Sequence, residues 1–317
     1  MTMEEGHRKE CLEQLSLTIY TITMILGLPS NVLALIVPIK NTRNQRATPN
    51  DVYMINLCLA NLVFIAWLPI KILETFKNQW TFPNFVCLLY NFFHFSTIYA
   101  SILFLTAISA GRFLSIAFPI HYKLYKNARN SWLVCLVLWA IVLSHVALVF
   151  ITERNGDQYF VSPSDNNTST CFENFTQEQL DFLVPLRLEM AVVLFFLPLL
   201  VTAFCYLSCV VLVLRSSLHP ARKSRVVGVA VSTLLIFVAC FAPYNISHVV
   251  GFIQHQNVWW RREALLTSTC NAFLEPVVFF FLSSSLEHSF RQSWLSVKER
   301  WSSVNRKAVL FCTKRSG

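Results

Sequence analysis

The sequence predicts an all-α membrane protein: a seven-transmembrane helix bundle with a short C-terminal amphipathic helix. Three observations predict this fold. First, 55% of the 317 residues are hydrophobic and only 14% are charged, whereas roughly 25% are charged in soluble domains. Second, the apolar residues form runs long enough to cross the ~30 Å hydrocarbon core of a bilayer. Third, lysine and arginine gather on one side of those runs.

Seven uncharged or nearly uncharged runs predict the membrane spans. They cover residues 15–39, 52–70, 85–111, 130–152, 190–214, 226–254 and 264–286. An odd number of crossings puts the two ends of the chain on opposite sides of the membrane. Of the 26 lysines and arginines, 18 fall on one side, and the side richer in these residues faces the cytoplasm. We therefore predict an extracellular N-terminus and a cytoplasmic C-terminus.

This order predicts three regions: an extracellular N-terminus over 1–14, the seven-transmembrane domain over 15–286, and an amphipathic helix with a short basic tail over 287–317. The N-terminal residues lack the layout of a cleaved signal peptide, so we expect the first span to act as an uncleaved signal anchor. After the last span, Leu286, Phe290 and Trp294 recur every fourth residue. Such an apolar stripe is typical of a helix that lies on the inner membrane surface.

Three asparagines agree with this orientation. Asn166, Asn167 and Asn174 each begin an Asn-X-Ser/Thr sequence between the fourth and fifth spans, on the predicted outer side. They are therefore candidate glycosylation sites.

Composition and motifs also narrow the class of function. The formal charge of +9 comes mainly from the predicted inner segments, so it reflects membrane orientation and does not indicate nucleic acid as a partner. No CxxC or His/Cys cluster has the spacing of a metal site, and we expect neither a metal nor a cofactor. No arrangement of nucleophile and base predicts an enzyme. A membrane transporter remains the alternative from another class, although internal repeats and paired broken helices are lacking.

Short motifs recur in order along the predicted spans. They are Gly27-Leu28-Pro29-Ser30-Asn31-Val32, Leu57-Cys58-Leu59-Ala60-Asn61-Leu62, Trp139, Pro198, Cys240-Phe241-Ala242-Pro243 and Glu275-Pro276-Val277-Val278-Phe279. Together with Cys87 and Cys171, they resemble the rhodopsin-like class of G-protein-coupled receptors. The resemblance implies a plasma-membrane receptor that binds a heterotrimeric G protein and arrestin. It also implies a disulfide between Cys87 and Cys171, and a sixth helix whose kink at Pro243 moves during signalling.

Further stretches resemble the free fatty acid receptors, in particular their short-chain branch. They are Cys171-Phe172-Glu173-Asn174-Phe175, residues 183–189, residues 241–251 and Trp259-Trp260-Arg261. Residues 109–113 and 194–198 look more like the long-chain branch. The resemblance implies activation by free fatty acids, above all by acetate, propionate and butyrate. Longer-chain fatty acids, hydroxycarboxylic acids and other small anions remain alternative ligands.

The resemblance implies that Arg187 and Arg261 hold the ligand carboxylate. The chemistry agrees, because the planar fork of a guanidinium bonds both carboxylate oxygens. The alternative is that the two arginines reach out to the lipid head groups. Tyr244 and His248 are four residues apart on the sixth span, so they share a helix face. Both match family positions that line the head-group site.

Two further residues belong to the predicted site. His145 on the fourth span has a family counterpart. Glu173 follows Cys171 by two residues, so the implied disulfide would hold it over the mouth of the site. We predict that Glu173 pairs with one of the two arginines in the empty receptor, the alternative being a solvated loop acid. Arg262 is expected to be a solvated neighbour of the site, and His94 a packing residue.

The predicted inner half departs from the rhodopsin-like pattern. That class has an acid before its helix 3 arginine, and this chain has Gly111 before Arg112, so we expect a weaker restraint on the inactive state. Asn61 stands where the class has an aspartate, and Glu275 where it has asparagine or aspartate. The buried carboxylate has therefore moved from helix 2 to helix 7. A buried intramembrane acid needs a partner, and the candidates are Asn61, Asn31, Ser101 and Asn271. We predict roles in activation and G-protein coupling for Arg112, Asn61, Glu275 and Pro243.

Overall fold

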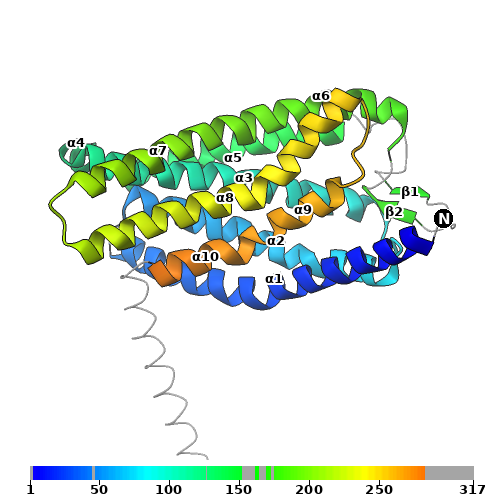
Figure 1. The fold of residues 1–317 in the computed structure, drawn as a ribbon, viewed down its shortest axis with the longest axis horizontal. Coiled ribbons are helices and arrows are strands. Elements are labelled where there is room, and N and C mark those ends of the chain that lie inside the picture. Colours follow the sequence, from blue (N-terminus) through cyan, green and yellow to red (C-terminus); the bar gives the residue numbers. More distant parts are fainter. Residues whose placement is uncertain are drawn as a thin grey trace, which may run out of the picture.

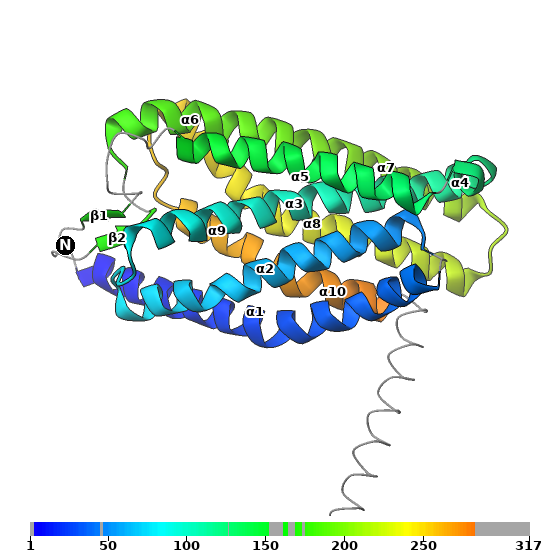
Figure 2. The ribbon, with the colours of Figure 1, turned by 180° about the vertical axis from the view of Figure 1, so that it is seen from behind.

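The structure is a computed structural model that describes residues 3–44, 47–125, 127–151, 161–163, 169–172 and 175–282. Glu173, the three predicted glycosylation sites and the predicted amphipathic helix with its tail lie outside these residues, so those assignments stay predictions. The described chain is almost entirely helical, and its long helices run side by side along one axis (Figure 1, Figure 2).

Helices are present for all seven predicted crossings. The first four are α1 (Met3–Arg43), α2 (Pro49–Lys77), α3 (Asn84–Ala117) and α5 (Ala128–Ile151). The fifth consists of α6 (Gln177–Ala191), the π-helical segment η1 (Val192–Phe196) and α7 (Leu197–Arg215). The sixth is α8 (Pro220–Gln254), and the seventh is α9 (Arg261–Thr269) followed by α10 (Asn271–Leu282). Within the described residues, six helical stretches are long and apolar enough to cross a membrane, and the seventh crossing is divided at Cys270.

Short elements mark the two ends of the bundle. The antiparallel strands β1 (Val161–Pro163) and β2 (Ser169–Cys171) lie near the N-terminus, and α4 (Pro119–Tyr125) lies at the opposite end (Figure 1). The last described helix, α10, also ends at the α4 end (Figure 1). The first described helix therefore begins at one end of the bundle and the last one finishes at the other, as seven crossings require. The predicted all-α fold with seven membrane crossings is confirmed.

The central helix of the bundle is α3. Every residue from 94 to 105 is buried, which requires neighbours on all sides of the helix. Near its outer end, Cys87 forms a disulfide with Cys171, the last residue of β2, with 5.8 Å between the two Cα atoms. The predicted disulfide is therefore present. It ties the second outer segment to the helix that carries Arg112 near its inner end.

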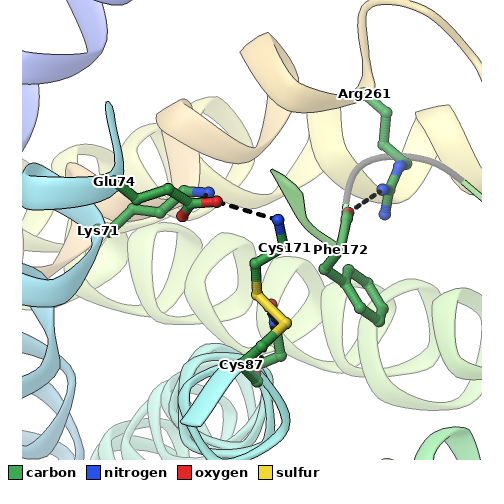
Figure 3. Close-up of a disulfide and its surroundings, with 7 residues drawn as sticks. Lys71, Glu74, Cys87, Cys171, Phe172 and Arg261 are labelled. Atoms are coloured by element: carbon green, nitrogen blue, oxygen red, sulfur yellow. Dashed lines mark hydrogen bonds and ion pairs between the residues drawn. A yellow bond between two sulfur atoms is a disulfide. The ribbon is translucent and has the colours of Figure 1, made fainter. Parts of the chain in front are cut away.

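Polar contacts hold the same segment to α2. The Cys171 N–H donates to Glu74 Oε1 at 3.1 Å, and Lys71 Nζ donates to Glu74 Oε2 at 2.8 Å (Figure 3). The next residue, Phe172, has a φ of 59°, a left-handed conformation that is costly for a bulky residue. The surrounding contacts therefore fix Phe172 in a position that it would not adopt alone.

The fifth crossing contains a π-helical turn. The Leu197 N–H donates to the carbonyl of Val192, five residues earlier. The next residue, Pro198, has no N–H to donate, so the regular ladder of backbone hydrogen bonds of the α-helix is interrupted at this point as well. Such turns occur frequently at functional sites, and Arg187 lies just outside this one.

Candidate ligand site

Two arginines meet beneath the second outer segment. Arg187 comes from α6 and Arg261 from the start of α9, and their guanidiniums lie over the same two aromatic rings. Arg187 Cζ is 5.9 Å from the ring centroid of Phe172 and 4.7 Å from that of Phe175. The corresponding distances for Arg261 are 5.7 and 5.3 Å. Because aromatic faces attract cations at such distances, the two rings hold both cations in one place.

The two arginines are buried, and their described neighbours leave one donor nitrogen of each unused. Arg187 is 7% exposed and Arg261 is 8% exposed, which argues against the lipid-head-group alternative, because snorkelling keeps the charge in water. Arg187 Nη1 donates to Asn257 Oδ1 at 3.3 Å. Arg261 Nη2 donates to the Phe172 carbonyl, also at 3.3 Å (Figure 3). Arg187 Nη2 and Arg261 Nε have no hydrogen-bond partner among the described residues. Buried cations of this kind are costly until an anion pairs with them.

Tyr244 and His248 complete this polar group from α8. Their rings touch edge to face with 4.4 Å between centroids, so the predicted shared face is confirmed. The Tyr244 ring stacks on Phe95 of α3. Both residues are buried within electrostatic reach of the two arginines. His248 Nδ1 has no hydrogen-bond partner in the described part of the chain, so the histidine adds a third unsatisfied polar atom.

His145 has different neighbours. Its Nδ1 lies 2.7 Å from the Ile141 carbonyl, and its Nε2 lies 3.1 Å from Glu189 Oε1. Glu189 is two residues beyond Arg187 on α6, so His145 adjoins the site through this carboxylate. A direct role in ligand binding stays a prediction for His145.

A cavity of about 270 Å³ opens beside Arg261, between the outer ends of α1, α2, α3 and α9 and the segment after β2. Arg262 is half-buried and lines this cavity, which places it next to Arg261, as expected of a neighbour of the site. His94 also lines it, and its Nδ1 lies 2.9 Å from the Tyr90 hydroxyl. His94 is otherwise enclosed by aromatic rings, as expected of a packing residue.

Sequence reasoning assigned no role to Phe172, Phe175 or Asn257. The two phenylalanines flank Glu173 in the stretch that the disulfide tethers, and large apolar residues in an outer loop were a signal that could have identified them. No comparable signal marks Asn257, because its contact with Arg187 depends on how the loop after α8 folds back.

At the inner end, Arg112 faces a second pocket. This pocket has a volume of about 280 Å³ and lies between α3, α7 and α8. Arg112 Nη1 donates to the Tyr206 hydroxyl at 3.4 Å, and its Cζ lies 6.0 Å from the Tyr206 ring centroid. Tyr206, from α7, therefore gives Arg112 a hydrogen-bond partner that the preceding Gly111 cannot provide.

The glycine before Arg112 is also a close contact. A Cβ added at Gly111 would collide with the carboxamide oxygen of Asn50 on α2. The missing side chain therefore lets α2 and α3 approach each other at this level.

Restoring the acid by Gly111→Glu is expected to reduce the amount of receptor at the cell surface, since overpacking a tight contact costs about 1–3 kcal/mol. In the double variant Gly111→Glu with Asn50→Ala, the new carboxylate has room to pair with Arg112. Basal G-protein activation should then fall below that of Asn50→Ala alone at equal surface level. A normal surface level of Gly111→Glu would contradict the first expectation, and equal basal activation by the double variant and Asn50→Ala would contradict the second.

A chain of buried polar groups connects four helices. Ser101 Oγ donates to Asn61 Oδ1 at 3.3 Å, and Asn61 Nδ2 donates to Asn31 Oδ1 at 3.1 Å. Asn31 Nδ2 in turn donates to the Ala272 carbonyl at 2.7 Å. That carbonyl would accept from the residue four positions later, but this is Pro276, which has no N–H. Asn31 therefore satisfies the acceptor that the proline leaves open.

Glu275 is 2% exposed and lies three residues after Ala272, whose carbonyl ends this chain of polar groups. With its carboxamide oriented to satisfy both residues, Asn271 donates to Glu275 Oε1 at 2.8 Å and Oε2 at 3.3 Å. Of the four predicted partners, Asn271 contacts the acid directly. Asn61, Asn31 and Ser101 bond to one another instead.

Comparisons with known proteins agree with this architecture. Residues 30–279 match the family model of the 7 transmembrane receptors of the rhodopsin family. The chain therefore belongs to this family, a class of G-protein-coupled receptors and not of enzymes. Within it, the chain is 40% identical to free fatty acid receptor 3 of Mus musculus over 276 residues, which is 87% of this chain and 85% of that protein. It is also 40% identical to free fatty acid receptor 2 of Mus musculus over 292 residues (92% of this chain, 88% of the relative). Free fatty acid receptor 1 of Mus musculus is 36% identical over 280 residues (86% and 92%). The chain is thus a multi-pass receptor related to the free fatty acid receptors.

Proposed function

We propose that this receptor is activated by short-chain carboxylates such as acetate, propionate and butyrate. The observation that carries the proposal is the pair of buried arginines, Arg187 and Arg261, each with a donor that no described residue accepts from. Tyr244 and His248 supply a polar wall beside them. The names of the relatives support a carboxylate ligand. The adjoining cavity of about 270 Å³ is smaller than the roughly 300–1,000 Å³ typical of drug-sized ligands, which favours a short chain.

Binding at this place has a route to the sixth helix. A carboxylate that takes the Arg261 guanidinium replaces the Phe172 carbonyl there. Farther along α9, Thr267 Oγ1 donates to the Cys240 carbonyl at 2.8 Å, three residues before Pro243. The same crossing therefore contacts both the ligand and the kink of α8. A ligand shifts the equilibrium between the inactive and the active receptor only by its differential affinity for the two states. We expect the active state to have a wider pocket at Arg112, which the G protein and arrestin would enter.

A matched panel of ligands tests the proposal. Linear acids from acetate to decanoate, lactate as a hydroxy acid, and propionamide as the uncharged analogue of propionate are compared by G-protein activation in cells that express the receptor. We expect acetate, propionate and butyrate to be the most potent and propionamide to be inactive. Equal potency of the amide, or a clear preference for decanoate or lactate, would show that the ligand class is wrong.

A further inference from the structure

A titratable pair lies where α5 meets α6. His145 places each of its ring nitrogens on an acceptor, because Nδ1 lies 2.7 Å from the Ile141 carbonyl and Nε2 lies 3.1 Å from Glu189 Oε1. A neutral imidazole has one N–H to donate, whereas an imidazolium has two. The arrangement is therefore fully hydrogen-bonded only when it holds one proton more than a neutral histidine beside an ionised glutamate.

This pair is more accessible than the arginine site. The His145 side chain is 22% exposed and that of Glu189 is 43% exposed, whereas Arg187, two residues before Glu189 on α6, is buried. Histidine is also the side chain that ordinarily changes its charge between pH 5 and 8. A proton can therefore be exchanged at the pair without opening the buried site.

The charged surroundings of the pair belong to the ligand site. Helices α2, α3 and α6 pack against α5. The α2 contact lies nearer the inner end, where Trp139 Nε1 donates to Asn56 Oδ1. At the level of Glu189, the titratable groups that we assign to the other two helices are Tyr99 on α3 and Arg187 on α6. Tyr99 lies within electrostatic reach of Glu189 and of both site arginines, so the pair and the arginines share one neighbourhood.

Charge couples the pair to an anionic ligand. Without the extra proton, the pair carries one negative charge, which opposes the binding of an anion at the arginines. Uptake of a proton cancels this charge. For two unit charges about 10 Å apart near a protein surface, with solvent screening taken into account, the effect corresponds to about threefold to tenfold in affinity. By linkage, the bound anion favours the bound proton to the same extent.

We propose that His145 and Glu189 form a proton-binding site that makes the receptor respond to a carboxylate and to extracellular acidity together. The inference rests on the proposed function, since the anion on the arginine pair is the ligand to which the proton is coupled. It adds a second input to that function. As the outer pH falls, a given concentration of carboxylate activates more of the receptor.

The experiment measures the potency of propionate in G-protein activation at about pH 7.5 and at about pH 6, on either side of the ordinary histidine transition. Propionate stays largely ionised at both, because an unperturbed carboxyl has a pKa of about 4. On the parent receptor, propionate should be about threefold to tenfold more potent at the lower pH. Its potency should not depend on pH in His145→Gln or Glu189→Gln. Glu189→Gln should also respond at the higher pH as the parent does at the lower.

His255→Gln is the matched control. His255 follows the outer end of α8 and is exposed, so its loss should leave the pH dependence as it is in the parent.

Calorimetry on the purified receptor gives a second measurement, which also serves if a variant signals too weakly. Propionate binding to the parent at about pH 7 should take up protons, because linkage is reciprocal. The uptake appears as a binding heat that varies with the ionisation enthalpy of the buffer. Glu189→Gln should show no such variation.

The outcomes separate the inference from the proposed function. Equal potency at both pH values, together with no proton uptake, would overturn the proton site while the carboxylate function stands. An acid advantage that persists in both variants would also overturn it and assign the effect to another group, such as His248 beside the arginines. If propionate fails to activate the receptor at either pH, the proposed function itself has failed.

Discussion

Arg187→Ala and Arg261→Ala should each abolish the response to acetate and propionate while the receptor still reaches the cell surface. Both arginines are more than nine-tenths buried, and each has a donor nitrogen without a hydrogen-bond partner among the described residues. Losing one partner of a buried charge pair costs roughly 2–5 kcal/mol, about thirtyfold to several thousandfold in affinity. Dose–response curves of G-protein activation, normalised to surface level, measure this loss.

Lysine substitutions separate charge from geometry. Arg187→Lys and Arg261→Lys should recover part of the response, because the charge returns but the planar fork does not. Lys77→Ala, which removes an exposed outer cation, should leave the response unchanged. Normal signalling to carboxylates by both alanine variants would refute the role of the arginine pair.

Glu275→Gln should raise basal G-protein activation while leaving the fold intact. Asn271 donates to both oxygens of the buried carboxylate, and a glutamine offers one oxygen and a new donor in their place. The substitution therefore weakens the contact between Asn271 and residue 275 on α10. The neighbouring Pro276 has no N–H, so the backbone hydrogen bonding of the helix is already incomplete there. Glu275→Ala should be harsher, because leaving Asn271 buried and unpaired costs about 1–3 kcal/mol. Basal signalling equal to the parent at equal surface level would count against a switching role.

Exchanging the side chains at positions 61 on α2 and 275 on α10 tests whether the buried carboxylate has moved from the second crossing to the seventh. Asn61→Asp alone should reduce surface level, because Asn61 donates to Asn31 Oδ1 and an ionised aspartate has no donor. The double variant Asn61→Asp with Glu275→Asn restores the usual pattern of the rhodopsin-like class. Sodium-dependent signalling that appears in the double variant and in neither single variant would support the exchange. Its absence would leave the two substitutions as independent features.

Much of the fold follows from the sequence alone. The number of crossings and the orientation are properties of run length and loop charge, since the bilayer sets the length of a span and the cytoplasmic side collects lysine and arginine. The helices extend beyond the predicted spans. The first begins at Met3 and the fifth at Gln177, because helical hydrogen bonding continues past the apolar run. The division of the seventh crossing at Cys270 had no marker in the hydrophobic pattern.

Only part of the candidate ligand site could be predicted from the sequence. A family resemblance identified Arg187, Arg261, Tyr244 and His248, and helical spacing correctly placed the last two on one face. Neither could show that Phe172 and Phe175 bring the two guanidiniums together, or that Arg262 joins Lys71 in one cavity. Periodicity reports which residues share a face of one helix, whereas contacts between helices depend on packing and on the disulfide that fixes the outer segment. The sequence by itself therefore determined the membrane architecture and the cationic character of the site. Only the tertiary structure decided which cations lie together, because that depends on how the helices and the outer segment pack against one another.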